Sequence, residues 1–309
     1  MMSDYAWTVV VPSLNEGRRL KDTVASVLSS AGDAAVEVVV VDDHSDDYSG
    51  HDVYLRYQGD DRVQVVSGET RLGVGQARHF GAQAARGRRL FFLDAHSKLP
   101  AAWPEELGAA FAKCGDQVVY GTALRPFSDA PEQEGANYAT AYGVWFDTPD
   151  LNEHYSPHRD FSEHPYTVMG LPGGSMVMDR DFYLELGGFD PGLAAPWGQE
   201  NMELCVRAWM MGYEVRVIPS VVAETYYKPP TEGNPGVKHE NLLYNRLRIC
   251  LLYFSPERIE KVLEHVRHEE DFSKAMAELF CRRWHTLAPR QIEWQRHPEW
   301  LFEKFSLRW

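Results

Sequence analysis

Continuous apolar runs alternate with amphipathic segments along the first hundred residues of the chain. The runs in "WTVVVPS", "VEVVVVDD" and "RRLFFLDAH" have few polar interruptions, which is typical of strands covered on both faces of a parallel sheet. After the first run, Leu20, Val24, Val27 and Leu28 recur at helical spacing. "RVQVVS" and the helical "GVGQARHFGAQAARG" repeat the order of strand, helix and strand. The pattern predicts a doubly wound, mainly parallel α/β sheet.

The pattern changes after a further strand in "QVVYGTALRP". Residues 127–168 are rich in Pro, acidic, His and aromatic residues with weak periodicity, which predicts a long irregular, substrate-facing insertion. Regular structure returns with "GGSMVMDRDFYLELGGFD", the helical "WGQENMELCVRAWMMG" and the strand "EVRVIP". From about residue 239 a helical pattern dominates. We therefore expect one domain over residues 1–238, with halves of about 1–125 and 126–238, and a helical C-terminal extension over 239–309.

Polar side chains gather where the predicted strands end. The run "RRLFFL" stops at Asp94 and His96, which point to the same side of an extended segment because one residue separates them. Both side chains can ligate a metal, so they can converge on one ion beyond the strand. The alternative is a solvated strand end. The second strand likewise ends in "DDHSDD", and the carboxyl ends of strands are where such sheets bind ligands.

Composition and charge narrow the class of protein. Apolar residues make up 44% of the 309 residues, as in an ordinary globular chain. With 45 acidic against 31 basic residues the net charge is -14, which argues against nucleic acid as a partner. An anionic ligand would need a metal or a few Arg. The four cysteines are spaced too widely for a zinc or redox motif. With no signal-peptide or membrane-anchor pattern recognised, we expect a cytoplasmic location.

Six motifs, taken in order, give the chain a family resemblance. They are "VVVPSLNEG", "VVVVDDHSDD", "RLGVGQARHFGAQAARG", "FFLDAH", "GGSMVMDRDFYLELGGFD" and "WGQENMELCVRAWMMGYEVRVIP". Together they resemble the GT-A glycosyltransferases of family 2, and "LDAH" with "WGQEN" is similar to polypeptide N-acetylgalactosaminyltransferases. The resemblance implies a GT-A fold with a nucleotide-sugar half and an acceptor half. It also implies transfer of a sugar from a nucleotide-diphosphate donor, expected to be UDP-linked, to a peptide, small-molecule or glycan acceptor.

The resemblance also implies a set of site residues. Asp94 and His96 would hold Mn²⁺ or Mg²⁺, and the imidazole favours Mn²⁺; the ion would stabilise the charge that develops on the leaving diphosphate. Asp43 would accept a hydrogen bond from a uracil-like base, and Arg71 and Arg78 would lie beside the diphosphate. The expected donor-binding residues are Pro12, Leu14, Glu16, Asp43, Arg71, Gly75, Arg78, Asp94, Ala95, Gly173, Gly174 and Trp197.

The expected catalytic residues are Glu200 and Asn201 in "WGQEN". In an inverting enzyme a carboxylate here takes the acceptor proton, and in retaining relatives it mainly positions substrate; the sequence does not decide between them. The alternative is that Glu200 only caps the following helix. The third metal ligand is also open, because Thr225 stands where relatives carry a His. Glu224 is adjacent to it, and His239 could swing in when the Pro- and Gly-rich segment 225–241 closes as a lid.

Other readings of the sequence compete with this one. The main rival is a catalytically lapsed sugar- or peptide-binding module on the same fold. A nucleotidyltransferase is disfavoured, because the chain lacks the Gly-rich, basic loop that such enzymes use near the N-terminus. The segment "GVGQAR" is not a dinucleotide fingerprint, because Arg78 replaces the third Gly. His154, His158 and His164 are too poorly aligned to favour a second metal site. The aromatic tail "HPEWLFEKFSLRW" is expected to pack in the core or in a homodimer.

Overall fold

The computed structural model describes residues 5–127, 140–146, 148–156, 164–194, 196–226, 228, 237–282, 287 and 294–309. The strands are β1 (Trp7–Ser13), β2 (Val36–Asp42), β3 (Val63–Val66), β4 (Arg89–Leu93), β5 (Ser97–Lys98), β6 (Val118–Phe127), β7 (Val144–Trp145), β8 (His154–Tyr155), β9 (Tyr166–Thr167), β10 (Ser175–Asp179) and β11 (Glu214–Tyr226). The helices are α1 (Arg18–Ser30), α2 (Ser49–Arg56), α3 (Val74–Ala84), α4 (Trp103–Cys114), α5 (Arg180–Glu185), α6 (Glu200–Met210), α7 (His239–Tyr253), α8 (Pro256–Val266), α9 (Phe272–Ala277), the π-helical η1 (Glu278–Arg282) and α10 (Trp300–Lys304).

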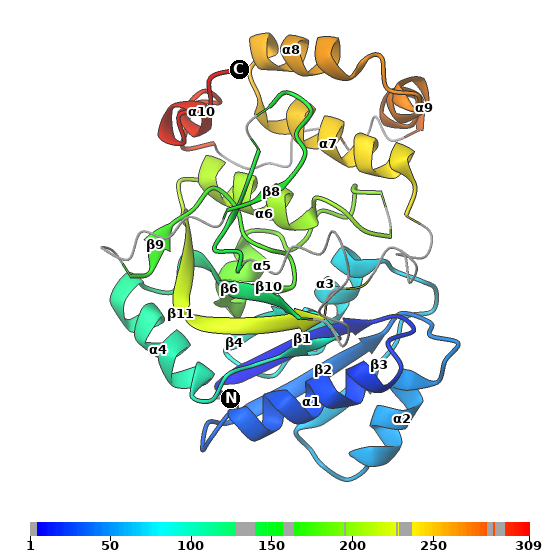
Figure 1. The fold of residues 1–309 in the computed structure, drawn as a ribbon, viewed down its shortest axis with the longest axis vertical. Helices are drawn as coiled ribbons and strands as arrows, with labels where there is room; N and C mark the ends of the chain where they lie inside the picture. The colour runs from blue at the N-terminus through cyan, green and yellow to red at the C-terminus, as the bar shows by residue number, and fades with distance from the viewer. Residues whose placement is uncertain are drawn as a thin grey trace.

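A mixed sheet forms the centre of the molecule, in the order β3-β2-β1-β4-β10-β6-β11-β5 (Figure 1). The block β3-β2-β1-β4 is parallel, as the Val-rich runs predict. β10 lies antiparallel between β4 and β6, and β6 pairs in parallel with β11. The strand order reverses at β1, whose neighbours are β2 and β4. Ligands of doubly wound sheets bind at the carboxyl ends of the strands beside such a reversal.

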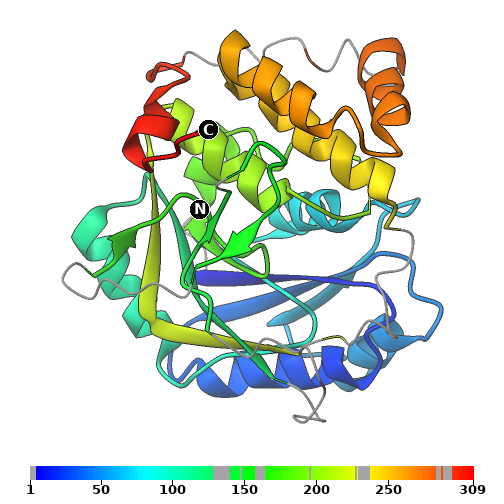
Figure 2. The same ribbon diagram turned by 45° about the horizontal axis from the view of Figure 1, so that its top comes forward.

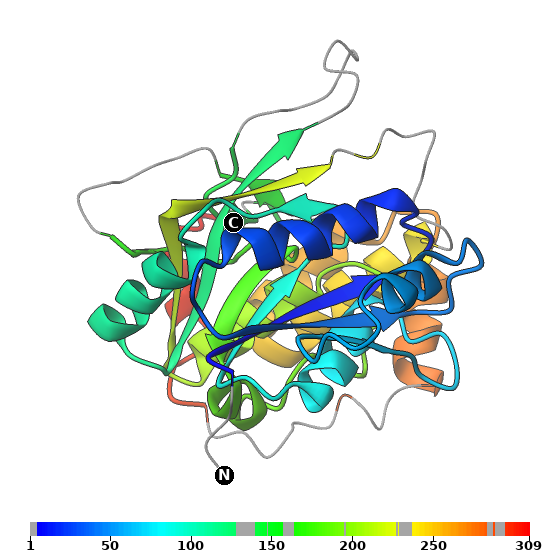
Figure 3. The same ribbon diagram turned by 90° about the horizontal axis from the view of Figure 1, so that it is seen from below.

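Two apolar cores cover the two faces of this sheet. Successive residues of β2 point to opposite faces of the sheet, so that Val39 and Val41 belong to one core and Val38 and Val40 belong to the other. One face packs against α1 and α4, whereas α3, α5, α6 and α7 supply the core on the other face. In Figure 3, α1 crosses the near face and the C-terminal helices lie behind the sheet. The doubly wound α/β class predicted from the sequence is confirmed.

The irregular insertion expected over residues 127–168 contains short strands in its described part. β7 and β8 pair as a small antiparallel sheet, and β9 joins the edge of β11. Residues 128–139, 147 and 157–163, including His158, lie outside the described residues. Among the residues that the structure describes, no three His, Cys, Asp or Glu side chains gather as a metal site. Most of the proposed lid segment also lies outside, namely residues 227 and 229–236.

The C-terminal helices pack on the second half of the sheet domain. Figures 1 and 2 show α7 to α10 gathered on the side of the molecule away from α1 and α2. Leu243, Leu247 and Cys250 on α7 belong to the same core as α6. Phe302 and Leu307 of the aromatic tail are also buried in that core. These helices therefore share their core with the preceding half; the division into one domain and an extension, like a homodimer, stays a prediction.

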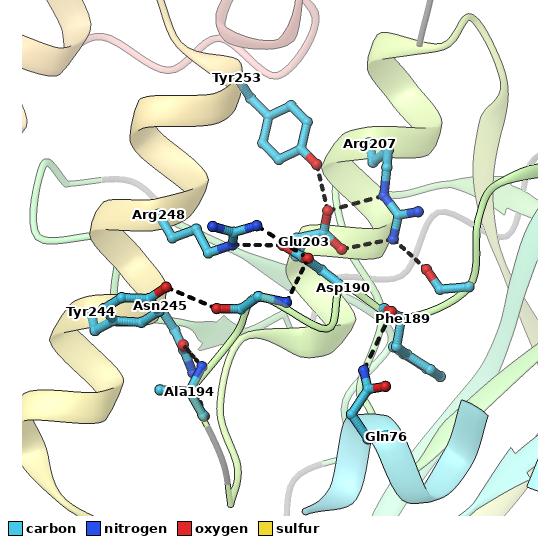
Figure 4. Close-up of polar contacts among 12 residues, drawn as sticks. Gln76, Phe189, Asp190, Ala194, Glu203, Arg207, Tyr244, Asn245, Arg248 and Tyr253 are labelled. Atoms are coloured by element: carbon cyan, nitrogen blue, oxygen red, sulfur yellow. Dashed lines mark hydrogen bonds and ion pairs between the residues drawn. The ribbon is translucent and has the colours of Figure 1, made fainter. Parts of the chain in front are cut away.

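Buried ion pairs fix α7 to α6 and to the loop before it (Figure 4). Arg248 bonds Asp190 at 2.7 Å, and both side chains are 3% exposed. Arg207 bonds Glu203 at 2.8 Å within α6, and Tyr253 of α7 donates a hydrogen bond to the same carboxylate. Removing one partner of such a pair would leave the other charge buried without compensation, which strongly destabilises the fold. These pairs therefore hold α7 in its place.

All four cysteines are described, and none forms a disulfide. In the part of the chain that the structure describes, no helix is long and apolar enough to cross a membrane.

The Asp190–Arg248 pair makes a stability prediction. Arg248→Met should lower the free energy of unfolding by about 3–5 kcal/mol, because the buried Asp190 loses its arginine. Urea denaturation measures the change. The matched control is Arg18→Met, since the Arg18–Asp22 pair has exposures of 87% and 54% and should change the free energy by less than about 0.5 kcal/mol. Equal losses in the two variants would contradict the prediction.

Candidate active site

A cavity of about 460 Å³ opens at the carboxyl ends of β1, β2 and β4. Most of the donor-binding and metal-binding residues expected from the sequence line it: Pro12, Leu14, Glu16, Asp43, Arg71, Asp94, Ala95, His96 and Trp197. Thr225, Tyr155 and Lys228 complete parts of its wall. The topological reversal of the sheet and the sequence motifs thus point to the same place.

Two loops at one side of this cavity hold each other in place. The loop after β1 contains Asn15 and Gly17, both with positive φ, at 55° and 54°. Gly17 N–H donates to Asp47 Oδ2 at 2.8 Å, and Asn15 Oδ1 accepts the N–H of Asp46 at 2.9 Å. Both acids follow β2. These cross-links explain why the polar "SLNEG" and "DDHSDD" segments occur together, and they fix Glu16 at the cavity wall.

Asp43 holds the backbone of the loop that begins α3. Its Oδ1 accepts the Leu72 N–H at 2.5 Å, and its Oδ2 accepts the Gly73 N–H at 3.0 Å. Arg71 Nε lies 3.8 Å from Oδ2. Asp43 therefore has a structural task besides the expected contact with a base, which stays a prediction.

Arg78 joins the two halves of the site. Its guanidinium is 2% exposed and bonds Asp94 Oδ1 and Glu200 Oε1, each at 2.9 Å. Asp94 follows β4 in the first half, whereas Glu200 begins α6 in the second. Arg78 itself does not line the cavity. The resemblance implied a place for Arg78 beside the diphosphate, which stays a prediction; in this structure its guanidinium orients the two acids.

The glycines at the start of β10 leave room for these acids. A Cβ added to Gly174 would lie 2.1 Å from Asp94 Oδ2, and one added to Gly173 would lie 3.4 Å from Glu200 Oε1. Gly75 is similarly close, since its added Cβ would be 3.5 Å from the Glu200 Cβ. The close approach of backbone to carboxylate accounts for small residues at these positions.

His96 is oriented by a carboxylate in the cavity wall. Its Nδ1 lies 3.1 Å from Glu16 Oε2, and Glu16 Oε1 accepts from Lys228 Nζ at 2.6 Å. Burial would raise the pKa of Glu16, but His96 and Lys228 outweigh it and lower the pKa to about 2. With Nδ1 bonded in this way, Nε2 is the nitrogen left for a metal, as in many carboxylate–histidine–metal arrangements.

Asp94 and His96 fit a divalent cation whose remaining ligands come from a diphosphate and water. Of the three candidates for a third protein ligand, only Thr225 lines the cavity. Glu224 is paired with Arg125 at 2.5 Å. His239 lies on α7 with its ring nitrogens 3.1 Å from Glu269 and 3.2 Å from Asp271. In this structure His239 is thus paired with two acids of the C-terminal extension, and its movement into the metal shell on closure of the lid stays a prediction.

Glu200 and Asn201 lie buried at the first turn of α6. Gln199, not Glu200, is the N-cap residue, and its side chain makes no capping bond. Glu200 Oε2 instead accepts the Gly198 N–H at 3.0 Å. The alternative of a purely capping role for Glu200 is thus too narrow, because its other oxygen bonds Arg78.

The loop before Glu200 is held by the C-terminal extension. Asn245 of α7 is fully buried; its Oδ1 accepts the Ala194 N–H at 2.6 Å and its Nδ2 donates to the Gly198 carbonyl at 2.8 Å. Figure 4 shows Asn245 beside Ala194. This link was not anticipated, because the sequence of α7 gives no signal about the partner of a buried polar side chain.

Three further residues were missed by the sequence analysis. Tyr155 and Lys228 line the cavity, and Glu153 Oε2 accepts from Asn201 Nδ2 at 3.3 Å. Tyr155 and Glu153 come from the irregular insertion, where weak periodicity gives no orientation. In the sequence, the only signal for Glu153 is its position two residues before the aromatic Tyr155.

Together, the sheet reversal, the nucleotide-sized cavity and the Asp94–His96 pair define a GT-A type α/β protein. Residues 8–187 match the family described as glycosyl transferase family 2, and the chain belongs to that family. Residues 153–230 also match the N-terminal domain of galactosyltransferase.

Curated relatives are N-acetylgalactosaminyltransferases. The chain is 30% identical to N-acetylgalactosaminyltransferase 7 of Mus musculus, covering 93% of this chain and 50% of that protein. It is 28% identical to polypeptide N-acetylgalactosaminyltransferase 11 of Xenopus tropicalis, covering 89% of this chain and 47% of the relative. The chain thus spans about half the length of the curated relatives it matches.

Solved structures with the same fold include the crystal structure of GalNAc-T7 with UDP, GalNAc and Mn²⁺. It superposes with a TM-score of 0.74 at 24% identity, covering 98% of this chain and 56% of that one. The S. aureus TarS 1-349 complex with UDP-GlcNAc gives a TM-score of 0.54 at 16% identity, covering 90% of this chain and 72% of the other. The expected GT-A fold is confirmed.

The contact between Gly174 and Asp94 makes a prediction about the site. Gly174→Ala should displace the Asp94 carboxylate and weaken Mn²⁺-dependent binding of UDP by about 10–100-fold, measured by calorimetry. The control is Gly108→Ala on α4, where the added Cβ would lie 3.9 Å from its nearest neighbour, Arg89. Circular dichroism should show both variants folded. Unchanged binding in Gly174→Ala would mean that Asp94 does not need its present position.

Proposed function

We propose that this protein is a metal-dependent glycosyltransferase that uses a UDP-sugar donor. The observation that carries the proposal is the single cavity at the sheet reversal that brings together the Asp43–Arg71 loop, Asp94 and His96. Family membership supports sugar transfer, and the names of its relatives make UDP-N-acetylgalactosamine the first donor to test. The acceptor is a nucleophile, such as a hydroxyl, on a peptide, small molecule or glycan.

The protein's own groups account for much of the donor's binding. Pro12 and Leu14 offer apolar contacts in the cavity wall, and Asp43 has lone pairs left to accept from a base. Arg71 and Lys228 place positive charge in the same wall. Such groups fix a nucleotide and its diphosphate in one orientation, which lowers the entropic part of the reaction barrier.

A divalent cation would be held by Asp94 and His96. When bound, it would neutralise charge on the leaving diphosphate. Because the imidazole of His96 is one of its two protein ligands, Mn²⁺ suits the pair better than Mg²⁺. Glu16 keeps the imidazole in one orientation through the bond to Nδ1.

The chemical step forms a bond between the acceptor oxygen and the anomeric carbon while the bond to the UDP oxygen breaks. The acceptor proton goes to a carboxylate in an inverting enzyme and to the leaving phosphate oxygen in a retaining one. Both Glu200 oxygens already accept hydrogen bonds, from Arg78 and Gly198. These bonds hold the Glu200 carboxylate in one orientation, which favours a role in positioning substrate, with Asn201 beside it.

The rival reading, a lapsed sugar- or peptide-binding module, rests on the missing third histidine. It predicts donor binding without turnover, so hydrolysis of UDP-sugar in the absence of acceptor separates the two. The expected cytoplasmic location and the absence of a nucleic-acid partner stay predictions, as does the lid over residues 225–241.

UDP should stabilise the folded protein, and more so with Mn²⁺ present. At a ligand concentration of about a hundred times its dissociation constant, binding should add about 2.7 kcal/mol to the free energy of unfolding. Thermal unfolding with UDP, GDP and no nucleotide, each with Mn²⁺ or a chelator, measures the effect. If no nucleotide changes the melting temperature, the cavity is not a donor site.

Asp94→Asn and His96→Ala should each abolish metal-dependent sugar transfer while cooperative unfolding is retained, because both residues lie beyond the apolar part of β4. A transfer assay with UDP-N-acetylgalactosamine and Mn²⁺ measures activity. The controls are Asp22→Asn, an exposed acid on α1, and His265→Ala, an exposed histidine on α8. Full activity in either site variant would remove that residue from the proposed metal pair.

A further inference from the structure

Glu153 is a carboxyl group of the candidate site that has no role in the mechanism above. It directly precedes β8, whose Tyr155 lines the cavity. Its Oε2 accepts one hydrogen bond, from Asn201 Nδ2 at 3.3 Å. Its Oε1 is shielded from solvent and has no hydrogen-bond partner among the described residues. A carboxylate in such a place would lack the donors that normally accompany a buried charge.

The surroundings of Glu153 disfavour a further negative charge. The negatively charged neighbour of Glu153 is the Glu200 carboxylate, and in the cavity wall Arg71 and Lys228 are paired with Asp43 and Glu16. Arg78 is already shared between Asp94 and Glu200. A donor diphosphate brings more negative charge to this region. An ionised Glu153 would therefore repel both Glu200 and the donor.

Hydrogen bonding is consistent with an uncharged acid. A protonated Glu153 can carry its proton on Oε1 while Oε2 still accepts from Asn201. Asn201 Nδ2 also donates to the Leu171 carbonyl at 2.8 Å, so the amide is held from two sides beside Glu200. Glu153 can accept this bond from Asn201 in either protonation state, but only the uncharged acid avoids a second negative charge near Glu200.

We propose that Glu153 is a positioning residue that works as an uncharged carboxylic acid. It holds the Asn201 side chain beside Glu200 and keeps an additional negative charge away from the donor diphosphate. The inference rests on the proposed function and adds to it a residue and a protonation state.

The electrostatic surroundings support this state. Burial raises the pKa of Glu153 to about 8; the hydrogen bond from Asn201 opposes the rise, and repulsion by Glu200 adds to it. The other titratable groups near Glu153 are Cys205 of α6 and Tyr155 of β8. Burial raises the pKa of Cys205, and partial loss of hydration together with nearby carboxyl groups raises the pKa of the half-exposed Tyr155. Glu153 is thus the group of this cluster expected to change charge between neutral pH and pH 9.

The test compares wild type with Glu153→Gln, which mimics the protonated acid. Calorimetry at pH 7 and pH 9 gives the dissociation constant of UDP with Mn²⁺. From pH 7 to pH 9, the dissociation constant of wild type should rise about tenfold more than that of Glu153→Gln, because about nine-tenths of Glu153 is ionised at pH 9. At pH 7 the two proteins should bind equally. UDP and Mn²⁺ change with pH identically in both titrations, so the comparison isolates Glu153.

Two controls accompany this comparison. Glu257→Gln removes an exposed acid on α8 and should follow wild type at both pH values. Glu153→Ala removes the acceptor for Asn201 and should bind more weakly than Glu153→Gln at pH 7. Equal pH dependence in wild type and Glu153→Gln would overturn the inference while leaving the proposed function intact. Failure of wild type to bind UDP at pH 7 would instead overturn the proposed function.

A second measurement needs no nucleotide. A folded-state pKa above the ordinary value means that folded protein retains a proton which unfolded chains release. Wild type should therefore lose stability relative to Glu153→Gln as pH rises from about 4.5 to about 8, with no further divergence above that. Urea denaturation across this range measures the difference. A constant difference would show that Glu153 is ionised in the folded protein and would reject the uncharged acid.

Discussion

The arrangement of the site depends on one buried guanidinium. Arg78 bonds Asp94 and Glu200 at equal distances of 2.9 Å, and so ties the end of β4 to the start of α6. The two acids come from different halves of the chain, and neither could stay in its place beside the other without an intervening cation. Arg78 is carried by α3, which packs on the sheet in the core that it shares with α5, α6 and α7. The packing of α3 therefore sets the separation of the two acids.

The constraint extends outward from Arg78 to elements that never touch the cavity. Gly174 must lack a side chain so that Asp94 can reach the guanidinium. On the other side, Gly198 donates to Glu200 and is itself held by Asn245 of α7. The buried pair of Asp190 and Arg248 anchors the same helix. The C-terminal helices are therefore part of the framework of the site, although the sequence suggested only an appended extension.

Much of the sheet and the position of the cavity could be predicted, because both follow from local pattern. Unbroken Val runs require burial on two faces, and polar residues at strand ends meet at one edge of a parallel sheet. The apolar repeat of α4, with Trp103, Leu107 and Phe111, was equally readable but was not used. By contrast, α2 has only 8 residues and buries Ser49, Gly50 and Val53, so it offers too few apolar positions to be told from a loop. Pairings such as Lys228 with Glu16 join distant positions and leave no local trace.

The excess of carboxyl groups around the cavity connects the proposed metal pair with the proposed protonation state of Glu153. The described cations that contact these acids are already paired with them, so the protein's own cations would offset only part of the charge of a diphosphate. A divalent cation on Asp94 and His96 would supply the missing positive charge, and an uncharged Glu153 would avoid adding to the negative one. Both would meet the same electrostatic need, that of an acidic protein with an anionic donor. The negative net charge of the chain argued against nucleic acid as a partner; a smaller anionic donor would be compatible with it at the place where a metal can be held.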